Sequence, residues 1–204
     1  MPAKIDREAR KYEIAVKAMK LFSQVGYDNV TLIMIASAAG VARTVLYRYF
    51  RSKREVFNAA IRTSTRAIMS QARKEMALGG KVSDRLSRVC FVVTDLLFEK
   101  REFLSAIFDF VLSMVRQGED MSGRIIELTG GIKEIFKSIL SDGVMKGEFN
   151  SDVNPEHTSE MFFSLLESCV LRIVLGTDKT SANIKRQFAD LILALNVNKL
   201  NNLH

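Results

Sequence analysis

Proline, cysteine and tryptophan are scarce in this chain of 204 residues, which holds two prolines, two cysteines and no tryptophan. Pro2 and Pro155 are the only prolines, so most of the chain lacks the residue that breaks helices most strongly. Long stretches that alternate apolar and polar residues with a period of two are also missing, which disfavours β-strands. The sequence therefore predicts an all-α protein.

The two cysteines stand alone in apolar stretches, with no second cysteine or histidine at the spacing of a zinc site. Free cysteine is among the most buried residue types, so we expect Cys90 and Cys169 to lie in the core. A redox-sensing disulfide is the less favoured alternative. Nucleophile–base motifs and phosphate-binding loops are missing as well, so we expect no enzyme activity, no metal and no cofactor.

Apolar runs long enough to cross a bilayer are missing, because Asp95, Asp109, Glu167 or Arg172 interrupts each of the long ones. The first residues are basic and amphipathic, and they lack the apolar core of a signal peptide. We therefore expect no membrane association and a location in the reducing cytoplasm.

Positive charge is concentrated in the first quarter of the chain. Residues 1–56 hold 11 lysines and arginines against 5 acidic residues, whereas residues 57–204 hold 19 against 18. Such an asymmetry is typical of a nucleic-acid-binding domain attached to a neutral one. A solvated basic face without a partner is the alternative, so the motifs of this quarter have to distinguish the two.

The first quarter begins with an amphipathic helix. Ile14, Ala18 and Phe22 recur at helical spacing, and most of the lysines and arginines lie off that apolar stripe. Gly26 offers a left-handed C-terminal cap, because glycine adopts positive φ values without a steric penalty.

Two short helices joined by a glycine corner follow. Thr31 can cap the first of them, which ends at Gly40, and the second is predicted over residues 42–49. Ser52–Glu55 has the form of a capping box that begins a long fourth helix. This order is typical of a helix-turn-helix, whose second helix enters the major groove of DNA. We therefore assign residues 1–56 to a helix-turn-helix DNA-binding domain.

The segments AMKLFSQVGYDNVT, IASAAGV, LYRYF and SKREVF, in this order and spacing, resemble the DNA-binding domain of the tetracycline-repressor (TetR) family. The resemblance covers about residues 10–57, and a later stretch, MKGEFNSDVNPEHTSEMF, is also similar to the family. The chain departs from the family pattern at Ala42, where a polar residue is usual, and at Thr44 and Val45, where small residues are usual.

The resemblance implies three phosphate contacts, at Thr31, Tyr47 and Lys53. Their hydroxyl and ammonium groups are donors that suit phosphate oxygens. Arg43 is our choice for base readout, because a guanidinium can bond O6 and N7 of guanine together. The further candidates on the predicted recognition helix are Ala42, Thr44, Val45 and Arg48. For Arg51 and Arg54, solubility explains the charge as well as DNA contact does.

Residues 57–204 are predicted to form a larger helical domain for ligand binding and dimerisation, which brings the total to about nine helices. The predicted helices after the helix-turn-helix cover residues 52–78, 83–100, 102–116, 122–145, 155–175 and 181–197. Gly130–Gly131 is the place for a kink within one of them.

The last two predicted helices carry broad apolar faces that one small domain cannot cover by itself. In the TetR family these helices pair with their copies from a second chain, so the resemblance implies a homodimer with twofold symmetry. The predicted interface residues are Met161, Leu165, Cys169, Ile173, Ile184, Phe188, Leu191 and Leu195.

Aromatic residues differ between the two parts, because all four tyrosines fall within residues 1–56 and the later aromatic residues are all phenylalanine. TetR-family proteins typically enclose a regulatory small molecule, so the resemblance implies a chamber for a largely apolar effector. The candidate lining residues are Phe91, Thr94, Phe98, Phe103, Phe108, Phe110, Met114, Phe136 and Phe162. A solid core is the alternative at each of these positions.

The leading functional hypothesis is a ligand-responsive transcriptional regulator. In this hypothesis a dimeric repressor binds a pseudo-palindromic operator in double-stranded DNA, and a small, largely apolar effector releases it. The alternative is a DNA-binding structural factor that has the same helix-turn-helix and no effector. An enzyme ranks far below both.

Overall fold

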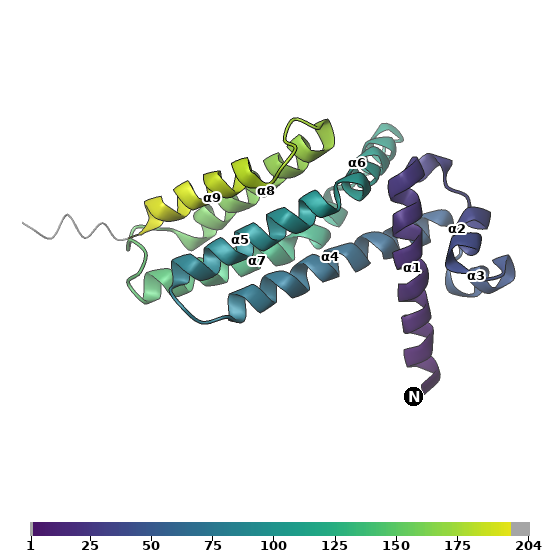
Figure 1. The fold of residues 1–204 in the computed structure, drawn as a ribbon, viewed down its shortest axis with the longest axis horizontal. Helices are drawn as coiled ribbons and strands as arrows, with labels where there is room; N and C mark the ends of the chain where they lie inside the picture. The colour runs from purple at the N-terminus through teal and green to yellow at the C-terminus, as the bar shows by residue number, and fades with distance from the viewer. Residues whose placement is uncertain (1, 197–204) are drawn as a thin grey trace, which may run out of the picture. The chain divides into compact units, whose positions relative to one another are not determined.

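The structure is a computed structural model that describes residues 2–196, with side chains from residue 7 onward. Over this part of the chain it forms nine α-helices and no β-strand (Figure 1). In chain order the helices are α1 (Pro2–Asn29), α2 (Leu32–Ala39), α3 (Arg43–Tyr49), α4 (Lys53–Ala77), α5 (Val82–Glu99), α6 (Arg101–Arg116), α7 (Ser122–Met145), α8 (Pro155–Leu175) and α9 (Ala182–Leu195). The predicted all-α class is confirmed, and Val197, the end of the last predicted helix, lies outside the described residues. None of the described helices is both long and apolar enough to cross a membrane.

The end of α1 differs from the prediction. Gly26 has φ 77° and ψ 165°, so its φ is positive, as a left-handed cap requires, but its ψ is extended. Essentially only glycine adopts this region of backbone space. The helical turns of α1 are therefore interrupted at Gly26 and resume in the short segment up to Asn29.

The predicted kink in α7 is absent. The helix runs through Gly130–Gly131 without a break. Gly131 instead allows a close approach to α4, because a Cβ atom added there would lie 2.9 Å from Cε of Met69. The glycine is thus explained by packing between helices and not by backbone bending.

Contacts divide the chain into two compact units. The first comprises Met1–Ala67 and Lys100–Arg124, so it holds α1, α2, α3, the first part of α4 and all of α6. The second comprises Ile68–Glu99 and Ile125–His204. The predicted boundary after residue 56 divides the chain by function, into a DNA-binding and a ligand-binding domain, and not by contacts. That boundary stays a prediction.

The first unit is built around a cluster of aromatic side chains from α1, α4 and α6. The ring of Phe57 lies 4.6 Å from Phe22 and 4.9 Å from Phe110, measured between centroids. Tyr27 lies 4.6 Å from Phe110 in an edge-to-face arrangement. Such pairs contribute beyond the area that they bury, and the three phenylalanines are almost fully buried. These rings fix α1 against α6, with which α1 is in extensive contact.

The second unit has its own core between α7, α8 and α9. Phe162 lies 5.6 Å from Phe136 and 5.7 Å from Phe188, and all three rings are buried. Cys90 and Cys169 are free, buried thiols, which confirms their prediction as core residues. Burial raises the pKa of the Cys169 thiol to about 12, so it is protonated at neutral pH and a poor nucleophile.

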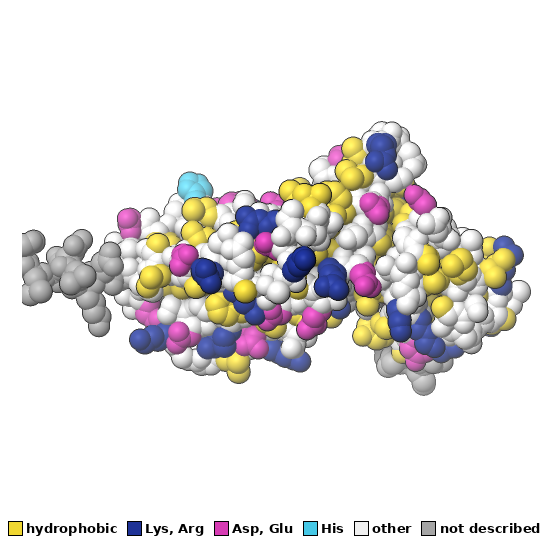
Figure 2. Space-filling model, turned by 45° about the horizontal axis from the view of Figure 1, so that its top comes forward, with side chains coloured by type: hydrophobic (Ala, Val, Ile, Leu, Met, Phe, Trp, Pro, Cys, Tyr) yellow, Lys and Arg dark blue, Asp and Glu magenta, His cyan; other side chains and the backbone are white. Residues whose placement is uncertain are grey.

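Ion pairs cover the outside of the second unit. Arg85 of α5 pairs with Asp142 of α7, and Nζ of Lys185 lies 2.6 Å from the Asp95 carboxylate. On the face shown in Figure 2, lysine and arginine side chains alternate with acidic ones over these helices. On this face of the second unit, positive and negative side chains are therefore mixed and not separated into patches of one sign.

Gly143 in α7 provides a test of this packing. A Cβ atom added there would lie 2.1 Å from Cδ2 of Phe149, whose ring is buried, so Gly143→Ala should overpack the core. We expect a loss of roughly 1–3 kcal/mol in the free energy of unfolding, measured by denaturant titration. Gly130→Ala in the same helix is the control, since a Cβ atom there meets nothing within 4 Å. The control should be neutral or stabilised by up to about 1 kcal/mol, and equal losses in both variants would contradict the packing.

Candidate nucleic-acid interface and helix-pairing surface

Backbone geometry at Gly40 fixes the corner between α2 and α3. Gly40 is left-handed, with φ 66° and ψ 37°, which ends α2 as a glycine cap does. Its N–H donates to the carbonyl of Ser37 at 3.0 Å, and the N–H of Val41 donates to that of Ala36 at 3.0 Å. These two bonds pair the carbonyls of Ala36 and Ser37 where the chain turns into α3.

The recognition helix α3 is held by two inner residues and presents the rest of its surface to solvent. Leu46 and Phe50 are buried, at 0% and 4% exposure. The predicted base-reading residues Ala42, Arg43, Thr44 and Arg48 are exposed, and Val45 is half-buried. This arrangement is what a helix needs to present side chains to base edges in the major groove.

Arg43 and Tyr47 are one turn apart and contact each other. Nη2 of Arg43 donates to the Tyr47 hydroxyl at 3.1 Å, and its guanidinium carbon lies 5.5 Å from the centre of the tyrosine ring. Because the Tyr47 hydroxyl acts as an acceptor here, its own hydrogen remains available for a phosphate oxygen. The remaining N–H groups of Arg43 are likewise free to bond a base.

Thr31 and Lys53 already have partners within the fold. Oγ1 of Thr31 accepts a hydrogen bond from the N–H of Met34 at 3.2 Å and so caps α2, as predicted. Nζ of Lys53 donates to the carbonyls of Tyr27 at 2.9 Å and Asp28 at 3.1 Å. Lys53 therefore also ties the start of α4 to the end of α1, which the sequence pattern did not indicate.

The predicted capping box at the start of α4 is confirmed with one change of partner. The N–H of Glu55 donates to Oγ of Ser52 at 3.2 Å. The Glu55 carboxylate accepts from the N–H of Arg51 at 2.7 Å, one residue before the usual partner. The start of α4 is therefore held by two capping hydrogen bonds.

Two basic residues of α1 have structural roles that the sequence analysis missed. Nη2 of Arg7 donates to the carbonyl of Arg48 at 3.1 Å, near the end of α3. Nζ of Lys17 lies 3.4 Å from the carbonyl of Ala39, the last residue of α2. Helix C-termini carry partial negative charge and unpaired carbonyls, so cations there are favourable. The only signal in the sequence was that these cations lie off the apolar stripe of α1.

Arg54, for which solubility was an equally good explanation, has a specific partner. It forms a bidentate ion pair with Glu119, in the segment between α6 and α7. The hydrogen bond from Arg54 holds the pKa of Glu119 below its usual value, so this carboxylate is ionised at neutral pH.

The predicted effector-lining residues are divided between the two compact units. Four of them lie on α6 in the first unit: Phe103, Phe108, Phe110 and Met114. The other five lie in the second unit: Phe91, Thr94, Phe98, Phe136 and Phe162. Within the second unit, Phe136 and Phe162 contact each other, and the buried hydroxyl of Thr94 donates to the carbonyl of Cys90 at 2.7 Å. The set as an effector-lining surface stays a prediction.

Four of the eight predicted dimer contacts are buried within the single chain. Cys169, Ile173, Ile184 and Phe188 are between 0% and 7% exposed within the single chain. They lie on the inner faces of α8 and α9, which cover the core of their own unit, and their role as dimer contacts stays a prediction. Periodicity identified the apolar residues of both helices but did not separate the inner stripe from the outer one.

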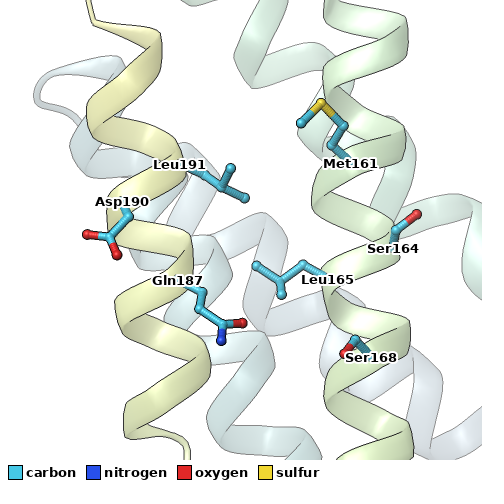
Figure 3. Close-up of a pocket in the computed structure, with 7 residues that line it drawn as sticks. All are labelled: Met161, Ser164, Leu165, Ser168, Gln187, Asp190 and Leu191. Carbon is cyan, nitrogen blue, oxygen red and sulfur yellow. The ribbon is translucent and has the colours of Figure 1, made fainter.

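The outer faces of α8 and α9 form an open groove that retains the other candidates. It is lined by Met161, Ser164, Leu165, Ser168, Gln187, Asp190 and Leu191. In Figure 3 the side chains of Leu165 and Leu191 point toward one another across it. Met161 is 58% exposed and lies at the edge of this groove. Leu195, the last predicted contact, is half-buried at the end of α9.

Relatives of this chain are regulators of transcription. The fatty acid metabolism regulator protein of Bacillus subtilis (strain 168) is 21% identical over 173 residues, which cover 82% of this chain and 84% of that protein. The HTH-type transcriptional repressor KstR2 of Rhodococcus jostii (strain RHA1) is 24% identical over 187 residues, covering 92% and 91%. Among solved structures, the regulator FadR from Bacillus subtilis in complex with stearoyl-CoA has the same fold, with a TM-score of 0.71, 17% identity and coverage of 89% and 97%.

Two family descriptions together match nearly all of the described helices. Residues 14–60, which include the helix-turn-helix, match bacterial regulatory proteins of the tetR family. Residues 62–195, about two thirds of the chain, match the C-terminal region of YsiA-like proteins. The chain therefore belongs to the TetR family of bacterial regulatory proteins, and it is a DNA-binding transcriptional regulator.

Proposed function

We propose that this regulator is a repressor that binds a pseudo-palindromic operator as a homodimer and leaves it when a small, largely apolar molecule binds. The observation that carries the proposal is the exposed face of α3, which presents arginine and tyrosine side chains while Leu46 and Phe50 anchor the helix from within. A protein of this kind acts on DNA in the cytoplasm, and the chain shows no motif for catalysis.

In the proposed complex the start of α3 reads base edges. Arg43 bonds a guanine, and Ala42, Thr44, Val45 and Arg48 complete the contact surface. Thr31, Tyr47 and Lys53 donate to phosphates, and Lys53 does so with the one N–H that its two carbonyl partners leave free. The bases and phosphates then fix the register of α3 in the major groove together.

Two copies are proposed to meet through the outer faces of α8 and α9. The groove between these helices holds small residues, Ser164 and Ser168, beside the exposed side chain of Met161 and the half-buried side chains of Leu165 and Leu191. Small residues permit close approach of helices, and apolar ones supply the burial that stabilises a four-helix interface. A twofold axis through this groove would present the two recognition helices to symmetric half-sites.

A long-chain acyl thioester is the first effector to test. One relative is named as a regulator of fatty acid metabolism, and a regulator of the same fold has been solved with stearoyl-CoA. The second unit is compatible with an acyl chain, because its aromatic residues are all phenylalanine and so carry no polar group. Failure to find any effector would favour the structural DNA-binding factor.

Replacing Arg43 should relax base specificity. Arg43→Ala removes a bidentate guanine contact that contributes roughly 1–3 kcal/mol of discrimination, so operator affinity should fall while affinity for scrambled DNA changes little. The operator can be obtained by selection from a random duplex pool, and competition binding then measures both affinities. Arg51→Ala is the matched control, because it removes the same charge from an exposed position just after α3. Equal losses on both duplexes for Arg43→Ala would contradict its role in base readout.

Charge placed in the α8–α9 groove should prevent dimerisation. Leu191→Glu would bury a carboxylate without a partner in the proposed interface, so the variant should be monomeric at micromolar concentration. Light scattering measures the mass directly. Leu193→Glu serves as the control, because Leu193 is 71% exposed on the same helix and does not line the groove. A monomeric parent protein, or dissociation by both substitutions, would refute this interface.

Effector and operator should weaken each other's binding. If stearoyl-CoA prefers the form that does not bind DNA, it should lower operator affinity by about 5- to 150-fold, and operator must lower stearoyl-CoA affinity by the same factor. Calorimetric titration of stearoyl-CoA with and without operator measures both sides of this linkage. Equal affinities in the two titrations would rule out induction by this ligand.

A further inference from the structure

Arg54 and Glu119 are joined across 65 residues of sequence by a two-pronged contact. Nη1 of Arg54 lies 2.7 Å from Oε1 of Glu119, and Nη2 donates to the second carboxylate oxygen. The guanidinium carbon also lies 5.9 Å from the centre of the Phe110 ring on α6. A bidentate arginine–carboxylate pair has a fixed planar geometry, so it restricts direction as well as distance. The pair therefore holds the first turn of α4 in a defined orientation to the end of α6.

The first turn of α4 in turn sets the orientation of the recognition helix. Only residues 50–52 separate α3 from α4. The N–H of Phe50 donates to the carbonyl of Leu46 at 3.0 Å, and the capping box of Ser52 and Glu55 closes the other end. A connection this short and this fully bonded leaves little freedom between the two helices. A change at Arg54 should therefore be transmitted to α3.

The Arg54–Glu119 pair is not the main contact that holds these helices together. The two side chains are 37% and 36% exposed, so solvent screens part of their attraction. The buried aromatic cluster of Phe22, Phe57 and Phe110 already joins the same helices. The ion pair adds to this packing by fixing the orientation of the first turn of α4, which is the end of α4 nearest to α3.

We propose that the Arg54–Glu119 ion pair is a positioning clamp for operator recognition: it holds the first turn of α4 against the segment after α6, and so keeps α3 in the orientation at which its base contacts form together. Neither residue needs to touch a base. The proposal rests on the DNA-binding role of α3 and not on the identity of an effector, so it can be tested with operator DNA alone.

Glu119→Gln is a test in which loss of the clamp and loss of the negative charge have opposite expected effects on operator affinity. Loss of a negative charge should by itself strengthen binding to any duplex, because DNA is a polyanion. Loss of the clamp should instead lower operator affinity, on the order of 10-fold, as expected when one base contact is misaligned. Affinity for scrambled duplex should stay the same or rise. Competition binding of operator against scrambled DNA at one salt concentration measures the specificity ratio.

Glu102→Gln is the matched control for charge. Glu102 lies in the first turn of α6, is exposed, and has no ion pair among the residues whose side chains are described. Its neutralisation should leave the specificity ratio unchanged. If Glu119→Gln behaves like this control, the clamp is refuted.

A double-mutant cycle separates the clamp from independent effects of its two residues. In an Arg54→Gln background, Glu119→Gln should cause no further change in the specificity ratio, because the pair is already broken. Additive losses would overturn the proposal. Should Glu119→Gln unfold, Arg54→Lys decides the question, since lysine keeps the charge but cannot form the planar two-pronged contact. A folded Arg54→Lys protein with an unchanged specificity ratio would refute the clamp.

Discussion

The aromatic packing of α1 against α4 and α6 is the constraint on which the DNA-binding unit depends. Phe22, Phe57 and Phe110 meet with their rings 4.6 to 4.9 Å apart and exclude water from the junction of three helices. Neither α2 nor α3 is long enough to be stable by itself, since isolated helices of fewer than about 12 residues are marginal in water. Both are formed because α1 and α4 hold the two ends of the segment that contains them.

Local signals in the sequence predicted the helix-turn-helix well because each of them acts over four residues or fewer. The Thr31 cap, the left-handed Gly40 and the capping box at Ser52 all join neighbours in the chain, and all three are present. The ion pair between Arg54 and Glu119 joins residues 65 apart. A single sequence does not indicate which acidic residue an arginine contacts when the two are so far apart along the chain. The DNA-binding residues were therefore predicted without the Arg54–Glu119 ion pair.

The same limit applies to the predicted pairing surface. α8 and α9 each carry apolar side chains on more than one face, and helical periodicity reports both stripes alike. Which stripe faces inward depends on the neighbours that other parts of the chain supply, such as Phe136, which contacts Phe162. Cys169 and Phe188 are buried in their own unit, whereas Met161, Leu165 and Leu191 line the groove between the two helices. The number of apolar residues was therefore a poor guide to the area available for a partner.

Net charge is an equally poor guide to the number of DNA contacts. Residues 1–56 hold 11 cations, but several of these are committed within the fold. Arg7 and Lys17 donate to carbonyls near the ends of α3 and α2, and Lys53 donates to two carbonyls of α1. Each phosphate contact adds about 0.9 to the slope of binding against salt concentration, on logarithmic scales. A cation whose donors are occupied by backbone carbonyls adds less, so the slope should fall well short of the charge count. The positive charge in this quarter of the chain thus has two roles: some cations bond the carbonyls at the ends of the short helices, and others are left to contact phosphates. The first role is a condition for the second, because it holds the helices that present the DNA contacts.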